Sequence, residues 1–150
     1  MARGTPPNIQ TNVHFDILRR GGARITPVVR AVVNHLFDSG AALAVEQLRE
    51  QVNRAQGWEL TPPTIYRIVD RLTRAGLLRR AHRGDNRTRY FLCRNPRDTH
   101  HHHFICTRCQ TVEEVDFCVA ERVESFVEKH LHATVTGHVM QFEGVCASCR

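Results

Sequence analysis

The sequence has no apolar run long enough to cross a membrane, and its first ten residues contain no apolar core of the kind found in signal peptides. Glycine and proline are few, with 9 and 6 residues among 150, and hydrophobic residues make up 41%, so the chain is not a disordered tail. We therefore predict a folded cytoplasmic protein with no membrane partner. In a reducing cytoplasm its six cysteines are expected to bind metal or act as redox thiols, and not to form a disulfide framework.

Acidic residues are scarce in only one part of the chain. Residues 1–92 contain 15 arginines and 7 acidic residues, a net charge of +8, whereas residues 93–150 contain 6 basic and 8 acidic residues, a net charge of −2. This split predicts two domains, 1–92 and 93–150, of which the first binds a polyanion. A solvated arginine-rich surface is the alternative interpretation of the same charge.

The first domain is predicted to be helical and to end in a hairpin. Apolar residues recur at helical spacing, between capping and breaking residues, over 12–20, 27–39, 45–56 and 62–76. The pattern then changes to two short strands, 77–80 and 89–92, around a polar turn at 83–86. Helices followed by a basic hairpin are the order of a winged helix-turn-helix, which would place the last helix in the major groove of DNA. A small helical domain with arginines for solubility stays open as the alternative.

The second domain is predicted to be a small α+β unit. Strand-like patterns occur at 104–105, 112–115 and 134–142. One helix is predicted at 119–130. The helix is expected to bury an apolar face formed by Val123, Phe126, Val127 and Leu131. The unit holds little aliphatic mass for its size, and a structural metal commonly supplements a core of that kind.

Two pairs of cysteines have the spacing of zinc knuckles: Cys106 with Cys109, and Cys146 with Cys149. Each pair can wrap two thiolates around one tetrahedral ion, and four thiolates leave no coordination position open for water. We therefore predict a zinc site that supports folding and neither senses nor catalyses. A redox dithiol pair and unligated buried cysteines are the alternatives.

A run of four histidines precedes the first strand of the second domain. In an extended chain His101 and His103 share one face, while His100 and His102 share the other, so the run can serve two metal sites. A disordered basic patch and an expression tag are the alternative interpretations.

The first of these faces is predicted to form a sensing site at the junction of the domains. Cys93 at the end of the hairpin and His82 near its turn would complete it with His101 and His103, and Glu114 is a substitute for His103 as fourth ligand. One thiolate and three imidazoles favour zinc over iron. For Cys93 alone, a small buried hydrophobic residue is the alternative.

The second face needs partners from elsewhere in the domain. Glu121 on the helix and His138 on the late strand would complete a third metal site with His100 and His102. The remaining candidates are interpreted as structural or solvent-facing: Cys118, Trp58, His14, His35, His130 and His132.

The chain resembles the ferric uptake regulator superfamily, and within it the zinc-sensing branch. The most specific stretches are Thr64-Ile65-Tyr66-Arg67, similar to the family's T-V-Y-R, and the run HHHHFICTRC at 100–109 with CASC at 146–149. The resemblance implies a homodimer built on the second domain, the four-cysteine zinc site, a hinge site that controls DNA affinity, and the third site with its four ligands.

Single positions refine the resemblance. His82 and Cys93 match ligands of the zinc-sensing branch, whereas Ala42 stands where iron-sensing relatives often have a histidine ligand. Val29 departs from the family, which often has an arginine there for a phosphate contact.

Together these features predict a zinc-responsive transcriptional repressor that binds palindromic double-stranded operator DNA as a homodimer, with zinc as co-repressor. Tyr66 would touch base edges, Thr64 belongs to the same DNA-binding set, and Arg67 and Arg24 would hold phosphates. The alternatives are an iron, manganese or peroxide sensor of the same superfamily, a zinc hydrolase with Glu113 or Glu114 as general base, and a zinc-stapled protein-interaction module.

Overall fold

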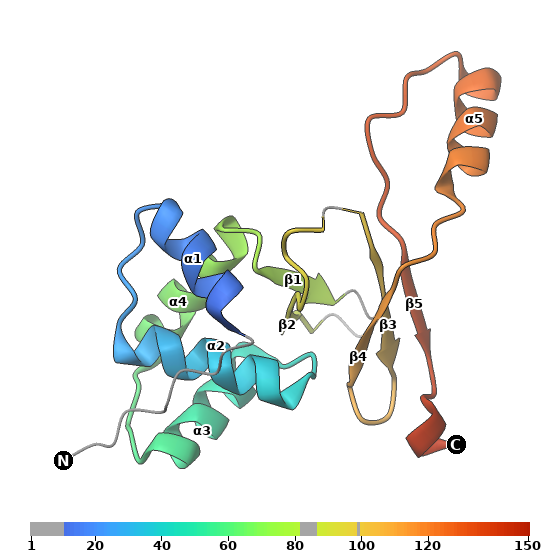
Figure 1. Cartoon of the computed structure of the whole chain (residues 1–150). Helices are drawn as coiled ribbons and strands as arrows, with labels where there is room; N and C mark the ends of the chain where they lie inside the picture. The colour runs from blue at the N-terminus through green and yellow to red at the C-terminus, as the bar shows by residue number, and fades with distance from the viewer. Residues whose placement is uncertain (1–10, 82–86, 99) are drawn as a thin grey trace.

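The computed structural model describes residues 11–81, 87–98 and 100–150, which form a helical half and a strand-rich half side by side (Figure 1). The helices are α1 (Asn12–Arg20), α2 (Pro27–Ser39), α3 (Val45–Gln56), α4 (Pro62–Arg74) and α5 (Ala120–Leu131). The strands are β1 (Leu78–Ala81), β2 (Arg89–Leu92), β3 (His102–Cys106), β4 (Val112–Val115) and β5 (Gln141–Gly144), and a short 3-10 helix follows at Ala147–Cys149. No helix in this described part of the chain has the length and apolar character that crossing a bilayer needs.

The first four helices pack around one apolar core, and their ends follow from local residue types. At the start of α2 the Thr26 hydroxyl accepts a hydrogen bond from the Val29 amide at 3.3 Å, and Pro27 takes the first helical position. Gly40 ends α2 and Gly57 ends α3, with φ angles of 57° and 68°. The largest fully buried side chains of this core are Phe15, Leu18, Leu36, Leu48, Ile65, Leu72, Leu77 and Leu78. The predicted helices of this half are confirmed.

The hairpin follows α4 directly. β1 and β2 are antiparallel, with Leu78 opposite Leu92 and Ala81 opposite Arg89. The predicted turn at 83–86 lies outside the described residues.

The strand-rich half is a three-stranded sheet in the order β4-β3-β5, in which β3 is antiparallel to β4 and parallel to β5. Of the predicted strand at 134–142, only Gln141 and Phe142 lie in β5, and residues 133–140 form no helix or strand. The sheet is therefore smaller than the sequence pattern predicts.

α5 differs from its prediction in what it packs against. Val123, Phe126 and Leu131, expected to face inward, are 57%, 60% and 70% exposed. The expectation is wrong for these three side chains, because α5 projects away from both the sheet and the helical core (Figure 1), whereas Val127 is half-buried. An apolar helix face identifies a surface to be covered, and within residues 11–81, 87–98 and 100–150 nothing covers these three side chains.

A strand-like segment between α2 and α3, residues 40–43, joins the two halves. On the side of the sheet, the Ala42 amide donates to the Gln110 carbonyl at 3.0 Å, and the Val112 amide donates to the Gly40 carbonyl at 2.8 Å. On the side of the hairpin, Leu43 pairs with β2. One short segment thus connects both sheets through the backbone.

Side chains of both halves pack behind this segment in a small cluster, here called the apolar joint: Ala42, Ala81, Phe91, Ile105 and Val112. Arg94 reaches back from the second half, where its guanidinium donates to the Phe37 carbonyl at 3.0 Å and lies over the Phe37 ring. Backbone hydrogen bonds, apolar contact and one guanidinium therefore dock the halves without a ligand.

We expect Gly40→Ala to destabilise the protein by about 2–3 kcal/mol and Gly57→Ala by about 1 kcal/mol. Both glycines have a positive φ, but a Cβ at Gly40 would also lie 2.9 Å from Nη2 of Arg94, whereas a Cβ at Gly57 would meet nothing within 4 Å. Urea unfolding of the two variants measures the difference. Equal losses would contradict the proposed contribution of Arg94 to docking.

Candidate metal centres

Three groups of side chains in the described ranges could each hold a metal ion, and within each group the ligand atoms lie within 4.8 Å of one another. The cysteine cluster consists of Cys106, Cys109, Cys146 and Cys149. The seam cluster consists of Cys93, His101, His103 and Glu114, and the third cluster of His100, His102, Cys118 and His138.

The cysteine cluster forms because β5 runs parallel to β3. Cys106 ends β3, and the second pair of cysteines follows β5, so the two knuckles arrive at the same end of the sheet. The Sγ atoms of Cys109 and Cys146 lie 3.7 Å apart. The Cys146 amide donates to Sγ of Cys106 at 3.4 Å, and this hydrogen bond holds the pKa of Cys106 below its usual value. The geometry suits the four-thiolate zinc site that the spacing predicts.

The seam cluster lies where the chain leaves the hairpin and enters the second half. Cys93 is buried directly after β2, and its Sγ lies 3.2 Å from Nε2 of His101. Glu114 on β4 stands opposite His103 on β3, with its Oε1 4.0 Å from Nε2 of His101. Nε2 of His103 is buried and has no hydrogen-bond partner in the described residues. An orphaned nitrogen beside a thiol and a carboxylate fits a metal ion.

The predicted sensing ligands are therefore brought together in part. Cys93, His101 and His103 meet, while His82 lies outside the described residues. Glu114, predicted as a substitute for His103, joins both histidines and replaces neither.

Hydrogen bonds from three neighbouring residues position the seam ligands. The buried His14 of α1 donates through Nε2 to the Cys93 carbonyl oxygen at 2.7 Å. Oε1 of Glu114 accepts hydrogen bonds from the amides of Arg94 and Asn95, both at 3.0 Å. A carboxylate has two oxygens, so one can hold these amides while the other binds a metal.

Burial sets the protonation of the seam ligands. It raises the pKa of the Cys93 thiol to about 11, with a smaller contribution from the Glu114 charge. It lowers the pKa of His103 to about 4, with the neighbouring His101 as the next cause. Near neutral pH a metal entering the cluster must therefore displace a proton from Cys93 and none from His103.

The third cluster is built on three imidazoles. The ring centroids of His100, His102 and His138 lie 5.1 to 5.4 Å apart. His102 is only 5% exposed, and its Nε2 has no hydrogen-bond partner in the described residues. Burial and the neighbouring imidazoles lower the pKa of His102, which favours the neutral form that binds metal.

The structure differs from the sequence prediction at the fourth ligand of this cluster. Glu121 is exposed on the first turn of α5 and does not belong to the group, because the segment before α5 brings Cys118 to the histidines instead. Sγ of Cys118 lies 3.6 Å from Nε2 of His138. The interpretation of Cys118 as merely structural missed this contact, although a cysteine and a histidine on either side of one helix could have indicated it.

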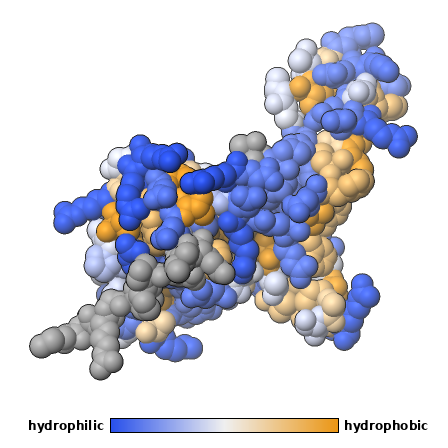
Figure 2. Space-filling view, in the orientation of Figure 1, coloured by the Kyte–Doolittle hydropathy of each residue, from blue (hydrophilic) through white to orange (hydrophobic). Residues whose placement is uncertain are grey.

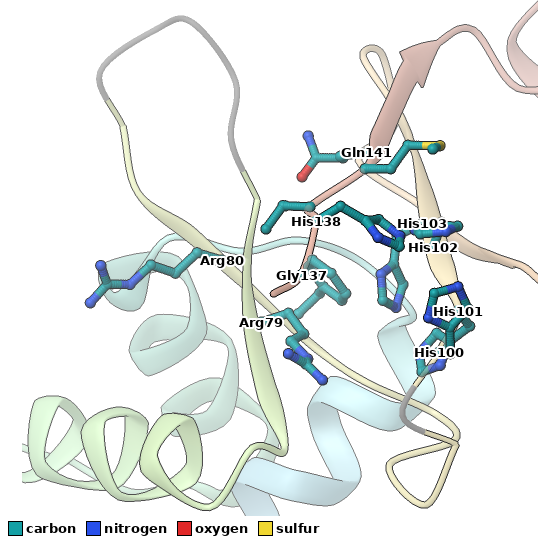
Figure 3. Close-up of a pocket in the computed structure, with 12 residues that line it drawn as sticks. Arg79, Arg80, His100, His101, His102, His103, Gly137, His138 and Gln141 are labelled. Atoms are coloured by element: carbon teal, nitrogen blue, oxygen red, sulfur yellow. The ribbon is translucent and has the colours of Figure 1, made fainter. Parts of the chain in front are cut away.

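A cavity of about 450 Å³ opens beside the histidine run. Figure 3 shows His100, His102 and His138 along one side of it and Arg79 and Arg80 of β1 along another. The third cluster is therefore reachable from solvent through the space between hairpin and sheet.

The residues predicted to bind DNA lie at the surface of the helical half. Tyr66 and Arg67 are exposed on α4, Arg24 is exposed before α2, and Thr64 is half-buried. The Tyr66 hydroxyl donates to the carboxylate of Glu46, which raises the pKa of Tyr66 and lowers that of Glu46.

Val29 lies in the core of this half, with 1% of its surface exposed. Its buried, apolar side chain offers no donor for the phosphate contact that an arginine there would make.

Comparison with known proteins gives a consistent family. The profile of the Ferric uptake regulator family matches residues 20–143. A ferric uptake regulation protein of Campylobacter jejuni is 29% identical over an alignment of 147 positions, which covers 92% of this chain and 92% of the relative. The peroxide-responsive repressor PerR of Staphylococcus epidermidis is 25% identical over 134 positions, which cover 89% of this chain and 85% of the relative.

A similar fold occurs among solved structures. A zinc uptake regulator complexed with zinc and DNA superposes with a TM-score of 0.71 at 22% identity, covering 95% of this chain and 96% of that chain. The likeness shows a shared architecture, in which a helical N-terminal domain precedes a C-terminal α/β domain.

We expect Cys109→Ser to lose one zinc equivalent per chain and to unfold at a lower temperature, while the matched variant Cys93→Ser keeps that zinc. A structural zinc site contributes roughly 10–16 kcal/mol of apparent binding free energy in zinc-finger peptides, which is comparable to the whole stability of a domain. Metal analysis after dialysis against a weak chelator, together with thermal unfolding, measures both effects. Retention of the zinc by Cys109→Ser would show that the cysteine cluster is not a structural site.

We also expect the Kd for zinc at the seam cluster to fall about tenfold per pH unit between about pH 7.5 and 8.5. Binding releases one proton from Cys93, whose pKa of about 11 lies above this range. Competition with a chelator, corrected for the chelator's own protonation, gives the slope. Cys93→Asp is the matched control, because its carboxyl is already ionised and its slope should be flat. A flat slope in the unsubstituted protein would argue against Cys93 as a ligand.

Proposed function

Because the chain belongs to the ferric uptake regulator family, we propose that it is a zinc-responsive transcriptional repressor that binds operator DNA as a dimer. Members of this family are transcriptional regulators that bind DNA and metal ions, and they are not enzymes. The zinc hydrolase with Glu113 or Glu114 as base is thereby excluded. Three points go beyond the family assignment: the identity of the metal, the place where it acts and the form of the DNA complex.

Zinc is supported by the thiol of the seam cluster, and this observation carries the proposal. Sγ of Cys93 lies 3.2 Å from Nε2 of His101. One thiolate, two imidazoles and one carboxylate are a set that tetrahedral zinc accepts, whereas manganous and ferrous sites lean toward oxygen ligands. Ala42 is buried in the apolar joint and offers no further ligand. The solved zinc uptake regulator, complexed with zinc and DNA, is consistent with this assignment.

An iron, manganese or peroxide sensor is the second candidate. It is favoured by the names of the relatives, a ferric uptake regulation protein and a peroxide-responsive repressor. Metal analysis of protein purified without added metal separates the candidates, because a zinc sensor retains zinc at the seam and loses it in Cys93→Ser.

The DNA-binding surface is proposed to be a winged helix-turn-helix made of α3, α4 and the β1–β2 hairpin. Tyr66 and Thr64 would reach base edges in the major groove, while Arg67 and Arg24 would hold phosphates. The net charge of +8 on residues 1–92 supports this surface, and operator binding should weaken steeply with added salt.

The second half is proposed to form the dimer. Its exposed apolar side chains are Phe117, Val119, Val123, Phe126, Leu131, Val139 and Phe142. Apolar patches are visible over this half in Figure 2. A second copy of the chain could bury such a surface and would present a second α4 to the next major groove of a palindromic operator.

Zinc at the seam would couple these two surfaces. Its ligands come from the end of the hairpin, from β3 and from β4, so an ion there restrains the hairpin and α4 relative to the dimer. The shift in DNA affinity can be only as large as the ion's preference for the DNA-competent arrangement.

We expect operator affinity to fall about 5- to 150-fold when the seam zinc is chelated and the cysteine cluster stays filled. Fluorescence anisotropy with a duplex selected from a random library measures the affinity, and metal analysis verifies the remaining zinc. Cys93→Ser should match the chelated protein whether or not zinc is added, and a scrambled duplex should show little response to zinc. An unchanged operator affinity after chelation would refute zinc as co-repressor.

A further inference from the structure

We propose that Cys118, and not Glu121, is the fourth ligand of a metal ion in the third cluster, and that this ion ties both ends of the α5 excursion, residues 116–140, to β3. The inference goes beyond the proposed function and does not depend on which metal fills the seam cluster.

The orientation of His138 supports a ligand at its inner nitrogen. Nδ1 of His138 lies 2.7 Å from Oε1 of Glu124, to which it donates. This hydrogen bond leaves the lone pair on Nε2, the atom that lies 3.6 Å from Sγ of Cys118. A carboxylate behind a metal-binding imidazole is a recurring arrangement that fixes the tautomer and the ring.

Cys118 is also held in place for binding. The Ala120 amide donates to Sγ of Cys118 at 3.3 Å, which anchors the sulfur in the segment before α5. With His100 and His102, the cluster then offers three imidazoles and one thiolate, a donor set that zinc accepts readily.

The acidic residues of α5 do not belong to the group of ligand atoms in the third cluster. Glu124 supports His138, and Glu128 accepts a hydrogen bond from the Val135 amide at 3.0 Å. Glu121 is exposed and lies outside the group of ligand atoms. Glu124 therefore supports the ligand His138 and is not itself a ligand of the cluster.

The place of the ligands in the chain gives the ion a mechanical role. Cys118 precedes α5 and His138 follows it, while His102 begins β3 and His100 lies two residues before it. The excursion itself carries exposed apolar side chains and projects from the sheet (Figure 1). An ion bound by all four residues closes the excursion as a loop on β3 and reduces its freedom before a partner binds.

Cobalt(II) tests the identity of the ligand, because a thiolate bound to cobalt gives a near-ultraviolet charge-transfer band. The measurement uses full-length Cys93→Ser, so that the seam thiolate is absent, with zinc retained in the cysteine cluster and verified by metal analysis. We expect a band that adding Cys118→Ser removes and that adding Glu121→Gln preserves. No band at saturating cobalt, or a band that survives Cys118→Ser, would overturn the assignment.

Proteolysis tests the mechanical role, since Lys129 in α5 is the only lysine of the chain. A lysine-specific protease therefore cuts within the excursion and nowhere else. At zinc concentrations roughly 100 times the Kd of the third cluster, we expect cleavage to slow by up to about 100-fold in the unsubstituted protein and in Glu121→Gln. In Cys118→Ser, which keeps its cysteine-cluster zinc and thus its fold, zinc should not slow cleavage. Equal protection of Cys118→Ser and Glu121→Gln would overturn the role of Cys118.

Discussion

Cys93 is tied to three separate parts of the chain, and this constraint determines how the two halves meet. Its amide donates to the Leu77 carbonyl at the base of the hairpin at 2.9 Å, and its carbonyl accepts the hydrogen bond from His14 of α1. Its sulfur lies against His101 just before β3. A displacement of this one residue would therefore move the first helix, the hairpin and the ligand set together, which is the property a switch between halves requires.

The three clusters differ in donor type and in burial, and the differences suit separate tasks. The cysteine cluster offers only thiolates and leaves no position for exchange. The seam cluster buries Cys93 to 1% exposure, while His101 and His103 of the same cluster line the cavity beside the histidine run. The third cluster opens to the cavity beside the hairpin, and His100 is exposed there. Both histidine clusters therefore face this cavity, and the buried thiol of Cys93 distinguishes the seam cluster from the third.

Local sequence patterns predicted most of the fold because they describe local causes. Thr26 and Pro27 start α2 and Gly40 ends it through contacts within a few residues, and the alternation of His101 with His102 follows from any extended strand. The remaining ligands depend on distant parts of the chain. Glu114 reaches the seam through the register of β4 against β3, and Cys118 reaches His138 through the path of the α5 excursion. The spacing of residues in the sequence predicts neither of these two contacts.

The packing of the apolar side of α5 also could not be predicted from local sequence patterns. Helical spacing of Val123 and Phe126 predicts that one side of the helix is covered, but the pattern contains no information on which body covers it. Among the described residues that side is exposed, so the amphipathic pattern that elsewhere predicts a core here describes a surface that the chain leaves open.

Hydrogen bonds of the strand-like segment at 40–43 can report how often the two halves of the protein separate. The amides of Ala42 and Val112 are hydrogen-bonded only across the two halves, to Gln110 and Gly40. Their exchange with deuterated water should therefore follow the separation of the halves, while amides inside α2 or β3 follow other events. The exchange of these two backbone protons can in this way report how often the molecule opens, without DNA and without any substitution in the chain.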